Sequence, residues 1–217
     1  MLTLYYHPLA SYCWKVLIAL YEHGTPFERC VVDLGDADQR AALLALWPLG
    51  KFPVVRDGDR VVAESSIIIE YLDRRHAGPR PLVPADGDAA LEARRWDRIF
   101  DSHVQTPVQE IVFDRLRGAH GDLERAYATL TTVYALIEQQ LGASRWIAGD
   151  EFGFADCAAA PALFYAVTLR PFPDDAARLH AYFERLVARP SVQRTLEEAR
   201  PYFAHYPFAS EIPARFR

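Results

Sequence analysis

The sequence predicts two domains: a small α/β domain with a mixed sheet, followed by an all-helical domain. In the first part of the chain, β-prone and helix-periodic segments alternate in the order β-α-β-α-β-β-α. A stretch rich in proline and glycine follows at 76–88. Beyond it the strand signals stop, which indicates a boundary between domains. We therefore expect a first domain at 1–76, a linker at 77–87 and a second domain at 88–217.

The first strand is predicted over 2–6. The period then changes, and apolar residues from Cys13 to Leu20 recur at i, i+3, i+4 and i+7, which is typical of one face of a helix. This helix begins at Ser11, and Gly24 ends it because glycine tolerates left-handed backbone geometry. A second strand is expected over 27–32 and a short helix over 36–46.

Two short strands, 53–56 and 60–63, surround Asp57-Gly58-Asp59, which predicts an antiparallel β-hairpin. A helix follows over 67–72, with Ser65 or Ser66 as its N-cap. The strand–helix–strand opening of the chain implies a parallel pair, so the hairpin completes a small mixed sheet with helices packed on it.

The second domain is expected to hold only helices. The periodic segments are 89–117, interrupted at Thr106-Pro107, then 123–141, 154–167, 174–188 and 191–199. The segment 154–167 is apolar nearly all round, which indicates burial on most sides. The longest apolar run, 157–169, is too short to span a bilayer, so we expect no membrane insertion.

Composition excludes several classes of partner. The chain has 217 residues and a formal net charge of −5, with no clustered basic face of the kind that nucleic acid requires. Its three cysteines, Cys13, Cys30 and Cys157, have no metal-ligand spacing and make no disulfide framework. We therefore expect no metal site. A cytoplasmic location fits best, because no signal peptide precedes the first strand.

The segment 5–16 carries the first chemical signal. It reads as the end of a strand, a proline-bearing loop and the opening of a helix, with Ser11 and Cys13 at the helix start. The first N–H groups of a helix have no intrahelical partner, and the helix dipole is positive there. This point favours an anion such as a thiolate.

Four motifs in this order resemble the cytosolic glutathione transferases. They are the Ser11 helix start with Trp14-Lys15-Val16, then Lys51-Phe52-Pro53-Val54, then Glu64-Ser65 before Ile69-Glu70-Tyr71-Leu72, and Phe154-Ala155-Asp156. The resemblance covers nearly the whole chain and implies a thioredoxin-like first domain that binds glutathione. The bacterial serine-type members, zeta- and theta-like, look closer than the tyrosine and cysteine branches.

The resemblance implies a glutathione site in the first domain. Pro53 would follow a cis peptide bond and turn the Val54 backbone outward, so that its N–H and C=O pair with a peptide ligand laid alongside. Glu64 and Ser65 would hold the γ-glutamyl ammonium and carboxylate. Lys51, next to Phe52, is a partner for the glycyl carboxylate.

Two side chains compete for the glutathione thiol. Ser11 is the first candidate, although the serine of theta-like and plant phi-like members falls on Ala10 when the segments are aligned on Val16. Cys13 is the alternative, by a mixed disulfide with glutathione. Its place on the apolar face with Val16 favours burial instead. Tyr5 or Tyr6 would match the tyrosine branch of the family.

The second domain is expected to bind an electrophile. The resemblance points to His103, Phe113, Tyr165 and Phe172 as pocket residues, with the tail 203–217 folding over the site. The expected function is a glutathione transferase that uses glutathione as co-substrate and attacks a small hydrophobic electrophile as a homodimer. Two alternatives are a zeta-like cis–trans isomerase and a non-catalytic binding or regulatory protein.

Overall fold

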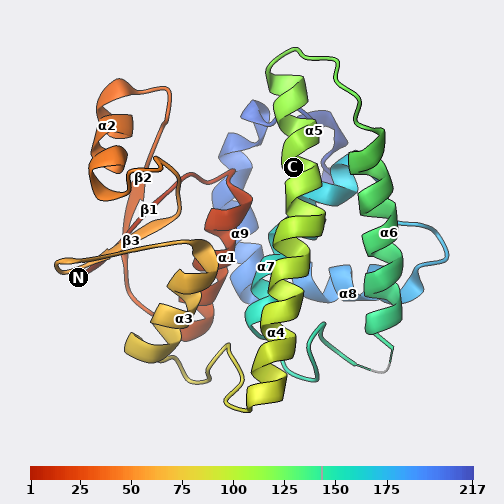
Figure 1. The fold of residues 1–217 in the computed structure, drawn as a ribbon, viewed down its shortest axis with the longest axis horizontal. Coiled ribbons are helices and arrows are strands. Elements are labelled where there is room, and N and C mark those ends of the chain that lie inside the picture. The colour runs from red at the N-terminus through yellow and green to blue at the C-terminus, as the bar shows by residue number, and fades with distance from the viewer. Residues whose placement is uncertain (143) are drawn as a thin grey trace.

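The computed structural model describes residues 1–142 and 144–217. The first part of the chain forms a four-stranded sheet in the order β2-β1-β3-β4 with three helices (Figure 1). β1 and β2 are parallel, whereas β1/β3 and β3/β4 are antiparallel, so the predicted mixed sheet is confirmed. Its elements are β1 (Leu2–Tyr6), α1 (Ser11–His23), β2 (Glu28–Val31), α2 (Ala37–Leu46), β3 (Val54–Asp57), β4 (Arg60–Ala63) and α3 (Ser65–Arg75).

The later part of the chain is helical, as predicted. No helix or strand occupies residues 76–86, between α3 and α4. The remaining helices are α4 (Gly87–Ile99), a π-helix (Phe100–Gln105), α5 (Thr106–Leu116), α6 (Glu124–Gln140), α7 (Phe154–Leu169), α8 (Ala177–Val187) and α9 (Pro190–Ala199). Short 3₁₀ turns complete the tail at Arg200–His205, Ala209–Glu211 and Ala214–Phe216. None of these helices, within the described residues, has the length and apolarity needed to cross a membrane.

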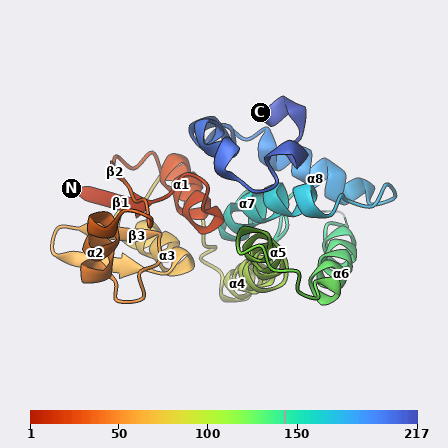
Figure 2. The ribbon, with the colours of Figure 1, turned by 90° about the horizontal axis from the view of Figure 1, so that it is seen from above.

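One apolar core joins the sheet to the helices. α1 lies between the sheet and α7, and its buried Trp14 contacts the rings of Phe164 and Tyr165 at centroid distances of 5.0 and 5.3 Å (Figure 2). The Trp14 indole N–H donates to the Pro8 carbonyl at 2.5 Å, and the Tyr165 hydroxyl donates to the Leu9 carbonyl at 2.7 Å. The loop between β1 and α1 is therefore held from both sides.

The structure differs from the sequence prediction where α4 runs into α5 and at the N-cap of α3. Thr106-Pro107 does not interrupt the long helix, because the chain passes from α4 through the π-helix directly into α5. Proline is tolerated there, since it stands in the first turn of α5. At α3, neither Ser65 nor Ser66 is the N-cap: that position belongs to Glu64, whose φ of 69° is in the left-handed region. Gly24 ends α1 in left-handed geometry, as predicted.

Asp156 fixes the start of the buried helix α7. One carboxylate oxygen accepts from the Gly153 N–H at 2.9 Å. The other accepts from the Tyr182 hydroxyl at 2.5 Å and the Ile147 N–H at 3.3 Å. Gly153 has no side chain, so only half of a capping box is present. Asp156 therefore has a structural role at the start of α7.

The burial of Asp156 leads to a testable pH dependence. Burial raises the pKa of Asp156 to about 6, against about 3.9 in an unfolded chain. Its contribution to the free energy of unfolding is thus present below about pH 4 and lost as pH rises through about 6, a change of roughly 3 kcal/mol. About half of this change falls between pH 5 and pH 8. Urea denaturation will show a flatter pH profile for Asp156→Asn than for the wild type, and equal slopes would contradict the assignment.

Candidate active site

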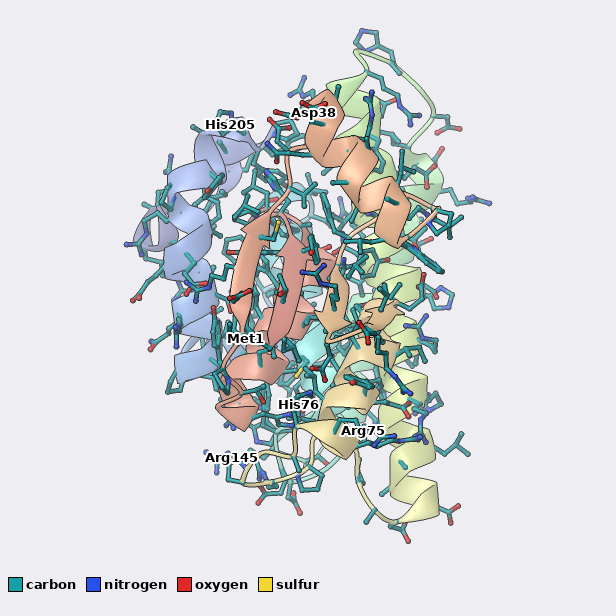
Figure 3. All side chains as sticks on the ribbon, turned by 90° about the vertical axis from the view of Figure 1, so that its left-hand side faces the viewer. Met1, Asp38, Arg75, His76, Arg145 and His205 are labelled. Atoms are coloured by element: carbon teal, nitrogen blue, oxygen red, sulfur yellow. The ribbon has the colours of Figure 1, made fainter. Side chains whose placement is uncertain are left out.

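A cavity of about 1050 Å³ lies between the sheet domain and the helical domain. Its walls come from the loop from β1 into α1, the loop before β3, the start of α3, one face of α4–α5, α7 and the tail, with Leu34 at its edge. In Figure 3, the tail residue His205 and the α2 residue Asp38 lie at the same end of the molecule, opposite His76 at the end of α3. The tail residues that line the cavity are His205, Tyr206 and Pro207, as the predicted folding of the tail over the site requires.

The start of α1 faces this cavity. α1 begins at Ser11, which lines the cavity, and its N-cap is Ala10 in extended geometry with no side-chain cap. The Ala10 carbonyl accepts from the N–H groups of Cys13 and Trp14. Within the described residues, the N–H groups of Ser11 and Tyr12 have no protein acceptor. This helix start therefore offers two free backbone donors and one hydroxyl to an anion.

Cys13 does not face the cavity. It is fully buried in the apolar core, and this burial raises the pKa of its thiol. A buried thiol with a raised pKa is a poor nucleophile. The geometry therefore does not support the mixed-disulfide alternative. Tyr5 and Tyr6, which are both on β1, also lie outside the cavity wall.

The loop before β3 contributes Lys51, Phe52 and Pro53 to the cavity wall. The Phe52–Pro53 peptide bond is cis, which confirms the geometry implied by the resemblance. Val54, however, is fully buried and pairs with Tyr5 on one side and Ala63 on the other, so its backbone does not face a ligand. The expectation for Val54 is corrected to Phe52, whose N–H and C=O bond to nothing within the described residues.

The start of α3 is the second anion-accepting point of the cavity. Glu64 and Ser65 both line it, as do Ser66 and Ile67. Glu64 makes no side-chain cap to the helix, and its left-handed φ turns the chain sharply from β4 into α3. The N–H groups of the first turn of α3 are thereby presented at the same cavity as those of α1.

Two of the four residues expected in the electrophile pocket line the cavity, namely Phe113 on α5 and Tyr165 on α7. His103 is exposed on the π-helix, where its neighbour Ser102 faces the cavity instead. Phe172 is buried elsewhere, with its ring at centroid distances of 5.0 Å from Tyr134 and 5.3 Å from Phe183. The chain turns after α7 and carries Phe172 into the core beside α6 and α8.

Sequence reasoning missed the face of α4–α5 that forms the opposite wall. The residues of this face recur every three or four positions, which is the spacing of one side of a helix. This spacing is visible in the sequence and could have predicted the face. They are Arg94, Arg98, Asp101, Gln105, Val108, Val112 and Leu116. Polar residues occupy the end nearer α3, and apolar residues occupy the other end.

A largely buried ion network runs through this wall, because Ser66, Asp97, Arg98 and Asp101 line the cavity. The Lys15 ammonium donates to Asp97 Oδ1 at 2.8 Å, to Asp101 Oδ2 at 2.8 Å and to Ser66 Oγ at 3.0 Å. The side chains of Lys15 and Asp97 are each 2% exposed. Arg98 adds ion pairs to both aspartates. The network links α1 and α3 of the first part of the chain to α4 and the π-helix of the second.

Comparisons with known proteins agree with this architecture. The family model for the glutathione S-transferase N-terminal domain matches residues 4–80, and the model for the glutathione S-transferase C-terminal domain matches residues 120–185. Glutathione S-transferase 3 of Zea mays is 35% identical over 209 residues, covering 90% of this chain and 93% of that protein.

Two further relatives extend the comparison. Glutathione S-transferase GstB of Escherichia coli (strain K12) is 26% identical, covering 90% of this chain and 98% of that protein. The crystal structure of glutathione transferase F7 from Populus trichocarpa superimposes with a TM-score of 0.80 at 23% identity, covering 92% of this chain and 99% of that chain, and shows the shared fold. The chain belongs to the glutathione S-transferase family of enzymes.

Proposed function

We propose that this enzyme binds glutathione at the start of α1, holds its thiol as a thiolate, and directs it at a small hydrophobic electrophile. The observation that carries the proposal is the shared cavity. Ser11 with two free N–H groups, the cis-proline loop and Glu64-Ser65 all face it. A free thiol has a pKa of about 8.5 and is mostly protonated at neutral pH. Lowering that pKa by two units corresponds to roughly 2.7 kcal/mol of preference for the anion.

The tripeptide would lie along the sheet domain. The Phe52 backbone pairs with the cysteinyl residue as an added strand. Ser65 and the first N–H groups of α3 take the γ-glutamyl carboxylate, and Glu64 takes the γ-glutamyl ammonium. Lys51, exposed at the cavity wall, is the partner for the glycyl carboxylate.

The apolar end of the cavity supports a hydrophobic electrophile. The apolar and aromatic residues that line it include Val112, Phe113 and Leu116 of α5, together with Tyr165 and Tyr206. Once the thiolate and an electrophilic carbon are held together here, proximity supplies much of the rate. The serine-type, zeta- or theta-like assignment, the domain division at 1–76, 77–87 and 88–217, and a homodimer belong to the same proposal. A cytoplasmic location is consistent with the three free cysteines.

Two other functions would give different results when the binding, the thiol pKa and the consumption of glutathione are measured. A zeta-like isomerase would bind glutathione but not consume it. A non-catalytic binding or regulatory protein would leave the thiol of any bound glutathione unactivated. Ala10, at the position where theta-like and phi-like members carry serine, is the residue that favours this last reading.

Thiol titration tests the proposal. Glutathione bound to the wild type will show thiolate absorbance about one to two pH units below free glutathione. An aryl halide will be consumed together with glutathione. Cys13→Ala is the matched control and will leave the thiol titration unchanged, since Cys13 is buried away from the cavity. A bound thiol that titrates like free glutathione would refute the mechanism.

A further inference from the structure

Arg98 of α4 lies beside the start of α3, although α4 belongs to the helical part of the chain. Its Nη2 donates to Ser66 Oγ at 2.8 Å, and the Arg98 side chain lines the cavity together with Glu64, Ser65 and Ser66. The side chain remains 58% exposed. A guanidinium from the second domain therefore stands at the point where the first domain offers its helix N–H groups.

Its surroundings hold Arg98 in place. The guanidinium pairs with Asp97 through Nε at 3.2 Å and Nη2 at 2.8 Å, and also pairs with Asp101. Both carboxylates are in turn fixed by Lys15. An arginine held by buried partners loses little side-chain entropy when it meets a ligand.

One end of the guanidinium remains for a ligand. Every hydrogen bond that Arg98 makes within the described residues uses Nε or Nη2, so Nη1 has no protein acceptor there. The two cations of the network, Lys15 and Arg98, balance the two aspartates, which are buried. An anion that reaches Nη1 thus meets a neutral network, with the dipole of α3 in its favour.

We propose that Arg98 binds the α-carboxylate of the γ-glutamyl residue of glutathione, together with Ser65 and the start of α3. This inference rests on the proposed function and adds a residue of the second domain to the glutathione site. An arginine–carboxylate contact is charge-assisted and directional, so it selects ligands that keep this carboxylate. The helical domain then takes part in choosing the thiol substrate as well as the electrophile.

The test compares two ligands and two variants. The ligands are glutathione and γ-aminobutyryl-cysteinyl-glycine. The second ligand lacks the α-carboxylate of glutathione and keeps every other group, including the amine on the same carbon. Dissociation constants are measured by calorimetry for the wild type, Arg98→Gln and Arg95→Gln. Arg95 is the matched control, because it sits on α4, pairs with Glu92 and does not line the cavity.

For Arg98→Gln we expect glutathione to bind about 10- to 100-fold more weakly, the size of one lost charge-assisted bond. The dissociation constant of the decarboxylated ligand will change by about twofold or less, and Arg95→Gln will change the dissociation constant of neither ligand.

Equal losses of affinity for both ligands, or no loss for either, would overturn the assignment of Arg98. If the wild type fails to bind glutathione at all, the proposed function itself fails, which is a separate result. Arg98→Lys, which keeps the charge but not the planar fork, will fall between the wild type and Arg98→Gln and serves if Arg98→Gln folds poorly.

Discussion

Replacing Lys15 by methionine will lower the free energy of unfolding by about 3–5 kcal/mol. Methionine has nearly the length of lysine, so the substitution removes the ammonium while leaving the packing of α1 nearly intact. Asp97 and Asp101 then remain buried at the junction of the two domains without the cation that stands between them. Equilibrium urea denaturation, followed by tryptophan fluorescence, measures the loss.

The same substitution predicts a change with pH. Burial already raises the pKa of Asp101, and Lys15 opposes this shift. Without Lys15 the pKa of this carboxyl rises further, so the folded variant takes up a proton that the unfolded chain does not hold. This bound proton stabilises the folded variant at low pH, and the stabilisation is lost as pH rises. The difference in free energy of unfolding between Lys15→Met and the wild type will therefore become smaller toward about pH 5.

Two variants sharpen the test of Lys15. Lys15→Met/Asp101→Asn will recover part of the stability that Lys15→Met loses, because Asp97 and Asp101 no longer have to share Arg98 as their one remaining cation. Arg125→Met, on the exposed face of α6, is the control for loss of a cation and will stay within about 0.5 kcal/mol of the wild type. If Lys15→Met is as stable as the control, the network has no structural role.

Ser11→Ala will raise the pKa of the bound glutathione thiol by about one unit and lower kcat up to about 10-fold near neutral pH. A hydrogen bond to a charged group contributes about 1.5–3 kcal/mol, and 1.36 kcal/mol corresponds to one pKa unit. The free N–H groups of Ser11 and Tyr12 remain in the variant, so some activation will persist. At a pH above the new thiol pKa, kcat will approach the wild-type value, since the thiolate then forms without help.

The neighbouring alanine provides the control for register. Ala10 also lines the cavity, one residue before Ser11. Ser11→Ala/Ala10→Ser moves the hydroxyl to the position that theta-like and phi-like members use. Recovery of the low thiol pKa in this double variant will show that the helix start tolerates either register. An unchanged titration in Ser11→Ala itself would remove Ser11 from the mechanism.

Local patterns in the sequence predicted much of the fold. The mixed sheet, the helix start at Ser11, its end at Gly24 and the buried helix after Gly153 all follow from periodicity, turns and caps, which involve residues close together in the chain. The cavity residues of the first domain, from Lys51 to Pro53 and at Glu64-Ser65, were predicted by resemblance, and the structure brings them to the same cavity as Ser11.

The errors concern residues whose role depends on distant neighbours. Val54 is buried between two strands, so the residue before the cis proline takes its expected place at the cavity. Phe172 and His103 are aromatic side chains of the helical part of the chain, as expected for pocket residues, but the turn after α7 and the π-helix carry them away from the cavity. Neither path can be read from residue type, because side-chain direction depends on the geometry of the whole element.

By itself, the sequence determined the two-part architecture, the family resemblance and the helix start at which we expect the thiolate to form. Only the tertiary structure decided that Cys13 is buried, that the wall opposite the glutathione site comes from α4–α5, and that Lys15, Arg98 and two aspartates join the two parts of the chain. The physical reason is the separation along the chain of the residues that interact. Caps, turns and periodicity act within a few residues, whereas burial and ion pairing depend on groups such as Lys15 and Asp101, which are far apart in the chain and adjacent only after folding.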